Sequence, residues 1–292
     1  MPYSLGVARL AELAFTKGHG TSNDFIIIPD PENQWHPSVE QIQWLCDRRR
    51  GLGADGLIRV VPTSAVPEFI DLGAAEWFMD YRNSDGSLAE MCGNGARVFA
   101  RYLLASGLVQ DREFVIATRA GLHEVVIHPD YSVSVSMGIA SFIPDDPEFD
   151  IAVSDSLVLS GGRGVLVPNP HAVVYLPDGQ ALDSLNISHA SVESIELFPE
   201  GVNIEFVQQL GERHVAMRVL ERGSGETLSC GTGACAVALT AMEKSNYPDS
   251  IEWRVDVPGG TLWVKRVEQR MWLRGPAELV ARGKVLIPAE LL

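Results

Sequence analysis

Two cysteines, Cys92 and Cys230, stand at matched positions in a sequence pattern that occurs twice in the chain. The first copy covers residues 79–97 and the second covers residues 217–235, which lie 138 positions later without a gap. In each copy the cysteine is followed by Gly-x-Gly-Ala and then by a stretch with the composition of a helix. The repeat therefore predicts two similar halves, each of which places a thiol at the N-terminus of a helix.

A helix N-terminus suits both a thiolate and a bound carboxylate. Its first backbone N–H groups lack partners inside the helix and carry a partial positive charge, and glycines let a ligand approach them closely. We expect this field to lower the pKa of each thiol from its usual value of about 8.5. Gly93 and Asn94 at one helix start, and Gly231 and Thr232 at the other, would then grip one carboxylate from both sides.

Two thiols on opposite faces of a carbon atom could invert its configuration. One thiolate would take the proton from the carbon next to the carboxylate, and the other group, still a thiol, would deliver a proton to the opposite face. The carbanion that forms is high in energy. The site must therefore stabilise the negative charge that spreads into the carboxylate, and it must exclude water. The other two cysteines, Cys46 and Cys235, have apolar neighbours in helical patterns and are expected in the core.

Composition and net charge argue against some classes of binding partner. A chain of 292 residues with 46% hydrophobic and 21% charged residues is typical of a soluble globular protein with room for two domains. The net charge of -15 argues against nucleic-acid binding and against attachment to anionic membranes. No apolar run approaches the about 18 residues of a membrane span. Without an export signal or zinc-ligand spacing among the four cysteines, we expect a cytoplasmic protein with no structural metal.

The elements that position the cysteines are mostly strands. Strands are expected at residues 15–28 (a pair), 56–61, 76–81, 113–118, 122–128, 131–137, 165–176 (a pair), 202–207, 214–220, 251–257 and 261–267. Helices are expected at residues 38–50, 96–105, 184–194 and 234–242. The helices that follow the two cysteines are apolar on nearly every face, which predicts that they are buried.

These elements predict an α+β fold with two pseudo-symmetric domains, each a mostly antiparallel sheet or barrel wrapped round one buried helix. The first domain would span residues 1–138 and be completed by residues 277–292, and the second would span residues 139–276. Residues 1–14 precede the first clear strand and are expected to form a short extra arm.

Six motifs together resemble those of diaminopimelate epimerases. They are Met91-Cys-Gly-Asn-Gly-Ala-Arg, Asn169-Pro-His, Glu221-Arg-Gly, Cys230-Gly-Thr-Gly-Ala, Asn83-Ser-Asp-Gly-Ser and Asn23-Asp-Phe. The resemblance implies a cofactor-independent enzyme that interconverts LL- and meso-2,6-diaminopimelate, in the branch that leads to lysine and peptidoglycan. It also implies an active site in the cleft between the two domains, and a homodimer.

The resemblance further implies roles for individual residues. Cys92 and Cys230 would be the base and the acid, and His171 and Glu221 would tune their pKa values. The reacting carboxylate would be held by Gly93, Asn94, Gly231 and Thr232. The remaining substrate contacts would come from Asn23, Asn83, Asn169, Asn203, Glu221 and Arg222.

The residues themselves support part of this assignment. Arg222 offers a planar fork that matches a carboxylate, as recognition of a second amino-acid head requires. Asn203 interrupts an apolar strand pattern, where asparagine is unfavourable, which favours a functional role. Asn23, Asn83 and Asn169 also suit a turn-forming role, because all three lie in turn-like sequence.

Three other interpretations stay open at this point. A racemase of another amino acid, such as a relative of proline racemase, would use the same pair of thiols. A binding protein that clamps an amino acid between two lobes would need neither thiol. A dinucleotide-dependent enzyme is the weakest alternative, because its Gly-x-Gly-x-x-Ala fingerprint should follow a strand directly, whereas residues 221–229 intervene here and the first copy has Val98 at the third small position.

Overall fold

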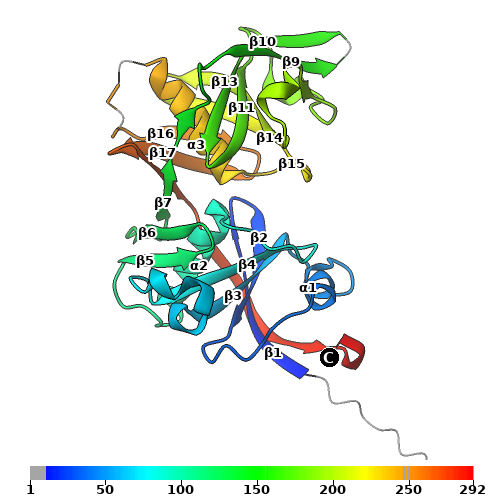
Figure 1. Ribbon diagram of the computed structural model, residues 1–292, viewed down its shortest axis with the longest axis vertical. Coiled ribbons are helices and arrows are strands. Elements are labelled where there is room, and N and C mark those ends of the chain that lie inside the picture. The colour runs from blue at the N-terminus through cyan, green and yellow to red at the C-terminus, as the bar shows by residue number, and fades with distance from the viewer. Residues whose placement is uncertain (1–10, 155, 246, 249, 292) are drawn as a thin grey trace, which may run out of the picture.

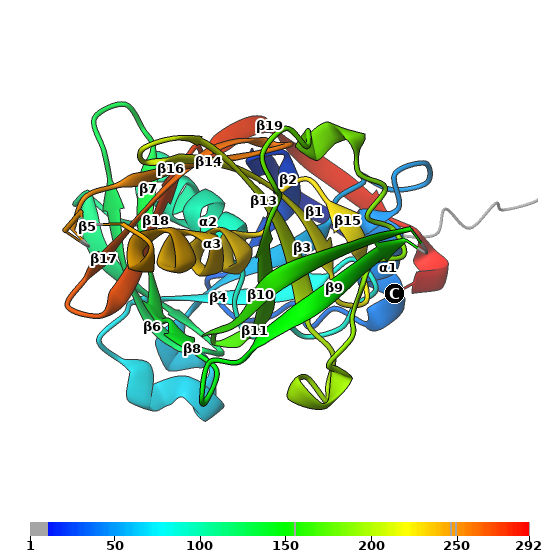
Figure 2. The same ribbon diagram turned by 90° about the horizontal axis from the view of Figure 1, so that it is seen from above.

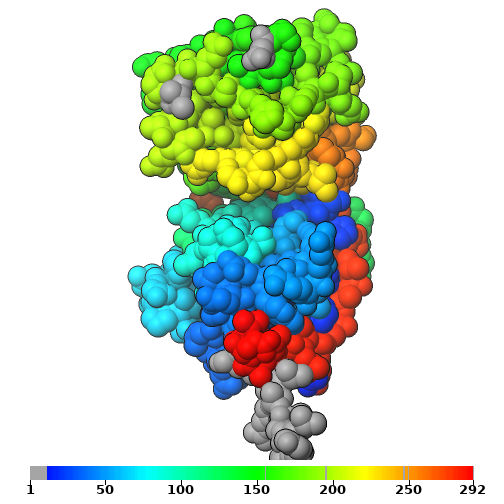
Figure 3. Space-filling view, turned by 90° about the vertical axis from the view of Figure 1, so that its right-hand side faces the viewer, coloured from blue at the N-terminus to red at the C-terminus, as the bar shows by residue number. Residues whose placement is uncertain are grey.

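The chain forms two lobes stacked along the longest axis of the computed structural model (Figure 1). The structure describes residues 11–154, 156–245, 247–248 and 250–291. A narrow waist separates the lobes on the face shown in Figure 3. None of the helices in these residues is long and apolar enough to cross a membrane.

The N-terminal lobe is a sheet of eight strands around one buried helix. Its strands are β1 (Ala11–Gly20), β2 (Asn23–Pro29), β3 (Gly56–Pro62), β4 (Trp77–Asn83), β5 (Glu113–Thr118), β6 (Gly121–Ile127), β7 (Val133–Ile139) and, from the end of the chain, β19 (Glu278–Ile287). They pair in the order β19–β1–β2–β3–β4–β5–β6–β7. The inner helix is α2 (Gly93–Ala105), and α1 (Val39–Cys46) packs on the outer face of the sheet.

Helices on both faces explain the run of apolar residues in β2. Phe25 and Ile27 point into the main core with α2, whereas Ile26 and Ile28 pack against α1. All four are buried, because successive side chains of a strand point to opposite faces.

The C-terminal lobe repeats this plan. Its strands are β9 (Glu148–Ser154), β10 (Leu157–Val167), β11 (Asn169–Tyr175), β13 (Asn203–Gly211), β14 (His214–Glu221), β16 (Trp253–Val257), β17 (Gly260–Val267) and β18 (Arg270–Gly275). Short strands are β8 (Ser141–Phe142), β12 (Ser191–Val192) and β15 (Gly225–Thr227), and the buried helix is α3 (Gly231–Glu243). The 3-10 helices of the two lobes are η1 (Thr63–Ala65), η2 (Pro67–Leu72) and η5 (Ala289–Leu291) in the N-terminal lobe, and η3 (Leu182–Ser184) and η4 (Ile195–Leu197) in the C-terminal lobe.

The two lobes share strand order and strand direction. The parallel pairings are β2–β3 and β4–β5 in one lobe, and β11–β13 and β14–β16 in the other. β7 and β18 occupy equivalent places and pair antiparallel with each other, which joins the lobes. Looking down the long axis, Figure 2 shows α2 and α3 one behind the other, enclosed by strands. The sequence repeat therefore reflects a repeat of the fold, and the predicted α+β plan is confirmed.

The expected N-terminal arm and the first expected helix have other bounds in the structure. Residues 11–14 are the start of β1 and pair with β19, so they belong to the sheet and not to an arm, while residues 1–10 lie outside the described residues. The helix expected at 38–50 ends at Cys46, because the Asp47 side chain accepts hydrogen bonds from the backbone N–H groups of Arg49 and Arg50 and forms a turn.

The prediction of a helix at residues 184–194 is wrong. That stretch contains the end of η3, turns and β12. Asn186 accepts hydrogen bonds from both the backbone N–H and the hydroxyl of Ser188. Such local bonds from short polar side chains compete with helix formation, which apolar spacing alone does not reveal.

Candidate active site

Both cysteines are the N-cap residues of the buried helices. The Cys92 sulfur accepts a hydrogen bond from the backbone N–H of Gly95 at 3.4 Å, at the start of α2. The Cys230 sulfur accepts the equivalent bond from Gly233 at 3.4 Å, at the start of α3. The prediction of two thiols at helix starts is confirmed. The hydroxyl of Thr232 lies 3.4 Å from the Cys230 sulfur.

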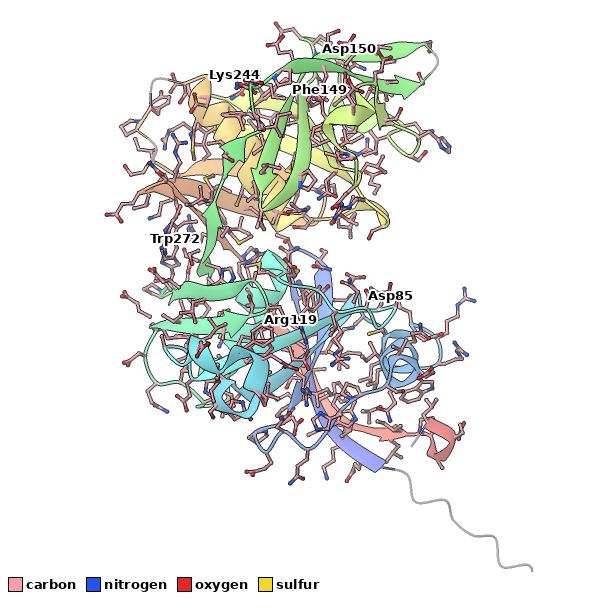
Figure 4. All side chains as sticks on the ribbon, in the orientation of Figure 1. Asp85, Arg119, Phe149, Asp150, Lys244 and Trp272 are labelled. Carbon is pink, nitrogen blue, oxygen red and sulfur yellow. The ribbon has the colours of Figure 1, made fainter. Side chains whose placement is uncertain are left out.

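The two helix starts meet at the junction between the lobes. A Cβ atom placed on Gly231 would lie 3.3 Å from the Cα of Gly93 and 2.9 Å from Cδ2 of Leu273. A Cβ atom on Gly93 would lie 2.9 Å from Cε of Met137 and 3.0 Å from Cδ2 of Leu273. Leu273 belongs to β18, the strand that also carries Trp272 at the level of the junction (Figure 4). A side chain at either position would therefore have to displace the end of Leu273, so both helix starts are closely packed.

Burial raises the pKa of both thiols. For Cys92 the pKa rises to about 11, since loss of hydration outweighs the hydrogen bonds from Gly95 and Asn94 and the charge of Arg97. For Cys230 the pKa rises well above its usual value, because the carboxylates of Glu221 and Glu205 add to the effect of burial. The expectation that the helix start lowers the thiol pKa is therefore wrong. The N–H groups act in the predicted direction, but desolvation is the larger effect.

Asparagine side chains surround Cys92. The amide N–H of Asn94 donates to Oδ1 of Asn23 at 3.2 Å and to the carbonyl of Ser229 at 3.1 Å, which ties the two lobes together. The Cys92 sulfur lies 3.7 Å from the same Asn23 oxygen. Asn23 in turn donates to Asp55 at 2.8 Å, and Asp55 also accepts from Arg48. The sequence had not indicated Asp55, whose role here is to orient Asn23.

His171 lies behind Cys230 in a fully buried polar cluster. Its Nδ1 is 2.6 Å from Oε1 of Glu205, and its Nε2 is 3.2 Å from Oδ1 of Asn169. The other oxygen of Glu205 has no hydrogen-bond partner among the described residues. Glu205 was not among the residues predicted from the sequence. A signal was present, because Asn203 and Glu205 are polar residues two apart, on one face of an otherwise apolar strand.

Glu221 is the last residue of β14, next to the junction, and Arg222 follows it. The Thr227 hydroxyl donates to Glu221, and burial raises the pKa of this carboxyl. The backbone N–H of Arg222 donates to Oδ1 of Asn203 at 2.9 Å, and its guanidinium donates to the carbonyl of Glu200 at 2.7 Å. A pocket of about 370 Å³ adjoins these residues, with Phe198 among the apolar side chains that line it.

Asn83 lies at the end of β4 and is engaged with its own loop. It accepts a hydrogen bond from the Tyr81 hydroxyl at 2.9 Å and donates to the Ser87 hydroxyl at 3.0 Å. The structure thus shows the turn-forming role that the sequence allowed for this residue. Asp85 of the same loop lies on the N-terminal lobe, near α1 (Figure 4).

Comparison with known proteins identifies the family. The model of the diaminopimelate epimerase family matches residues 15–143 and 165–280. The chain belongs to the diaminopimelate epimerase family. It is 48% identical over 281 residues to the diaminopimelate epimerase of Streptomyces coelicolor, covering 93% of this chain and 95% of that one. It is 42% identical over 282 residues to the diaminopimelate epimerase of Thermobifida fusca, covering 95% of this chain and 99% of that one.

Family membership confirms the predicted class of activity. The chain is an isomerase that works without pyridoxal phosphate and has diaminopimelate epimerase activity, which gives it a role in lysine biosynthesis. The interpretations as a binding protein and as a dinucleotide-dependent enzyme are thereby overturned.

Solved structures with the same fold are more distant in sequence. A predicted epimerase from Pseudomonas aeruginosa superposes with a TM-score of 0.68 at 15% identity, covering 94% of this chain and 100% of that one. A hydroxyproline epimerase from Agrobacterium vitis, with bound trans-4-hydroxy-L-proline, superposes with a TM-score of 0.61 at 16% identity, covering 94% and 92%. These likenesses confirm the fold.

Proposed function

We propose that the chain interconverts LL- and meso-2,6-diaminopimelate by moving one Cα proton between Cys92 and Cys230, without a cofactor. The observation that supports this most is the contact between the two helix starts, each capped by one of the thiols. The product would feed both lysine and peptidoglycan precursors. The enzyme would act in the cytoplasm, as a homodimer.

The reacting carboxylate would bind between the helix starts. Gly93, Asn94, Gly231 and Thr232 supply backbone N–H groups that have no acceptor inside their helices, and both helix dipoles present their positive ends there. The Asn94 side chain is occupied by Asn23 and Ser229, so a contact between Asn94 and the carboxylate would come from its backbone N–H, which also donates to the Cys92 sulfur. These donors stabilise the charge that moves into the carboxylate as the Cα proton leaves.

The proton transfer uses the two thiols in opposite states. A thiolate on one side forms an S–H bond with the Cα proton, and the electron pair of the broken C–H bond spreads into the carboxylate. The thiol on the other side then gives its proton to the opposite face of Cα and becomes the thiolate. The two cysteines have exchanged states, so the same site runs in reverse from the other isomer.

Glu221 and His171 would adjust the two thiols. The carboxylate of Glu221 acts on both thiols and would also bind the substrate ammonium, whose charge offsets the cost of burying this carboxylate. His171 acts from behind α3, through its contact with Glu205. Asn169 holds the other ring nitrogen of His171.

The distal amino-acid head would lie beside Arg222. The pocket lined by Glu221, Arg222 and Phe198 adjoins the junction, and Asn203 fixes the backbone of Arg222. Asn23 and Asn83 would complete the contacts from the N-terminal lobe. We also propose residues 1–138, with 277–292, and residues 139–276 as the two domains, which is supported by the pairing of β19 with β1.

Exchange of the Cα hydrogen tests this proposal. LL-diaminopimelate incubated with reduced enzyme in D2O is expected to gain deuterium at Cα as the meso isomer appears, with no added cofactor. L-proline under the same conditions is the control for a racemase of broader specificity and should gain none. Formation of the meso isomer without deuterium at Cα would contradict the proton transfer.

A further inference from the structure

The two lobes place different side chains in equivalent positions behind the helix starts. In the parallel pair β2–β3, Phe25 pairs with Gly56, and in β11–β13 His171 pairs with Asn203. This register makes Phe25 the equivalent of His171, and Ile58 the equivalent of Glu205.

Contacts at the third residue of each helix agree with that register. A Cβ atom on Gly95 of α2 would lie 3.4 Å from both Phe25 and Ile58. A Cβ atom on Gly233 of α3 would lie 2.6 Å from the carboxylate of Glu205. The start of α2 is therefore backed by apolar groups, and the start of α3 is backed by a buried acid.

A second difference lies inside the helices. Arg97 of α2 and Cys235 of α3 are 138 residues apart and hence equivalent. Arg97 is fully buried. Its guanidinium donates to the carbonyls of Gly93 and Pro276, both at 3.3 Å, to the Thr21 hydroxyl at 3.2 Å and to Oδ1 of Asn94 at 2.8 Å. All of these partners are uncharged, and among the described residues no carboxylate pairs with Arg97.

A buried cation whose partners among the described residues are all uncharged is costly, so the placement of Arg97 needs a reason. Arg97 lies one helical turn after Cys92, and the charge of each favours the ionised form of the other. Glu205 lies against the start of α3 and opposes ionisation of Cys230. Arg97 thus favours ionisation of Cys92, whereas Glu205 opposes ionisation of Cys230.

We propose that Arg97 and Glu205 are positioning residues that set the order of ionisation of the thiol pair: the first proton leaves Cys92, while Cys230 keeps its own. This inference rests on the roles proposed above for the two cysteines and deepens them. The thiolate of Cys92 supplies the counter-charge that Arg97 otherwise lacks. The enzyme then enters the cycle with Cys92 as the base and Cys230 as the acid.

The other charged groups near the thiols leave this order in place. Glu221 opposes ionisation of both thiols, so it does not select between them. Tyr81 faces Cys92, but burial raises the pKa of its hydroxyl and keeps it neutral. Asp55 lies beyond Asn23 and is paired with Arg48 at 2.7 Å.

His171 could offset Glu205 if it carried a proton. However, the carboxylate oxygen, and not the imidazole, is the group that lies against Gly233. Glu205 is therefore the member of this pair that contacts the start of α3. Arg97 acts independently of that pair, from the other lobe.

The pH dependence of alkylation tests the order directly. Full-length reduced enzyme is labelled briefly with iodoacetamide across a pH series, and modification at each cysteine is measured by peptide mass mapping. The midpoint of each profile reports ionisation and does not depend on access of the reagent. The midpoint for Cys92 is expected about one pH unit or more below that of Cys230, a tenfold difference in thiolate fraction. A lower midpoint for Cys230 would overturn the inference.

Two charge-removing variants assign the effect to the named residues. Glu205→Gln keeps the shape of the side chain and should lower the midpoint of Cys230, while Arg97→Gln should raise that of Cys92. Arg101→Gln, one turn further along α2, is the matched control and should move neither. If circular dichroism shows that Arg97→Gln does not fold, the test uses Glu205→Gln together with Arg97→Lys, which retains the charge. An unmoved midpoint in folded Glu205→Gln or folded Arg97→Gln would also overturn the inference, whereas Arg97→Lys should leave the midpoint of Cys92 in place.

Activity separates this inference from the proposed function. If Cys92→Ala or Cys230→Ala retained epimerisation, the roles of the thiols would be wrong and the inference would fall with them. If both variants are inactive but Cys230 has the lower midpoint, only the proposed order of ionisation is wrong.

Discussion

Cys92 and Cys230 have the same backbone geometry around them, but the charged side chains near them differ. Each cysteine caps a buried helix and accepts a hydrogen bond at 3.4 Å from the glycine three residues later. Behind Cys92, however, lies the buried cation Arg97, and behind Cys230 lies the buried acid Glu205. An enzyme that must run in both directions needs equivalent geometry on its two faces. The charges around that geometry can still differ, and they decide which face starts as the base.

The largest effect is expected when either thiol is removed. Cys92→Ala and Cys230→Ala should each lower the rate of epimerisation by about 10⁴-fold or more, because each removes one of the two proton-transfer groups. Cys46→Ala, which removes a core thiol of α1, is the control and should retain turnover.

Each cysteine variant should also keep a different half-reaction. The remaining thiolate can exchange the Cα hydrogen on its own face with D2O without inversion, so the two variants should label different isomers. Mass spectrometry of the recovered LL and meso substrates measures this. If both variants labelled the same isomer, the thiols would not lie on opposite faces.

The next largest effect concerns Glu221, whose equivalent 138 residues earlier is the uncharged Asn83. Glu221→Gln should lower kcat/KM by about 10- to 100-fold through loss of a charged contact with the substrate ammonium. Because this carboxylate raises the pKa of both thiols, its removal should move the acid limb of the pH–rate profile to lower pH. An acid limb that stays in place or moves to higher pH would show that Glu221 does not tune the thiols.

A smaller effect tests whether the helix starts are equivalent in packing. Gly93→Ala and Gly231→Ala should each lower the free energy of unfolding by about 1–3 kcal/mol, because the added methyl group meets Leu273 in both cases. Gly211→Ala is the matched control, since a Cβ there has ordinary contact at 3.6 Å. Chemical denaturation measures all three. Unequal losses for the two helix starts would show that the repeat does not extend to their packing.

The smallest effect is expected at Cys235. Cys235→Ala should cost about 1 kcal/mol of stability or less and leave the rate of epimerisation unchanged, because it removes one small buried group far from solvent. Burial raises the pKa of Cys235 to about 12, so the native enzyme should not be alkylated there at neutral pH. Rapid labelling of Cys235 in folded protein would contradict its placement in the core.

Local sequence signals were sufficient to predict the repeated framework. Cys-Gly-x-Gly-Ala at both helix starts, apolar helices after them and alternating strands before them indicated two similar lobes and the two thiols. These features depend on residues that are close in the chain, and short-range periodicity and capping specify them. The prediction of a helix at residues 184–194 was wrong because the local hydrogen bonds of Asn186 outweigh the apolar spacing on which the prediction rested.

Only the tertiary structure decided the electrostatics of the site. It showed that Arg97 is buried with only uncharged partners among the described residues, and that Glu205 lies 2.6 Å from His171, 34 positions away in the chain. It also reversed the expected direction of the thiol pKa shifts. Hydration and charge neighbours depend on which distant strands pack together, so no reading of adjacent residues contains them. The sequence by itself determined that there are two thiols in matched positions; the packing around them determined how they differ.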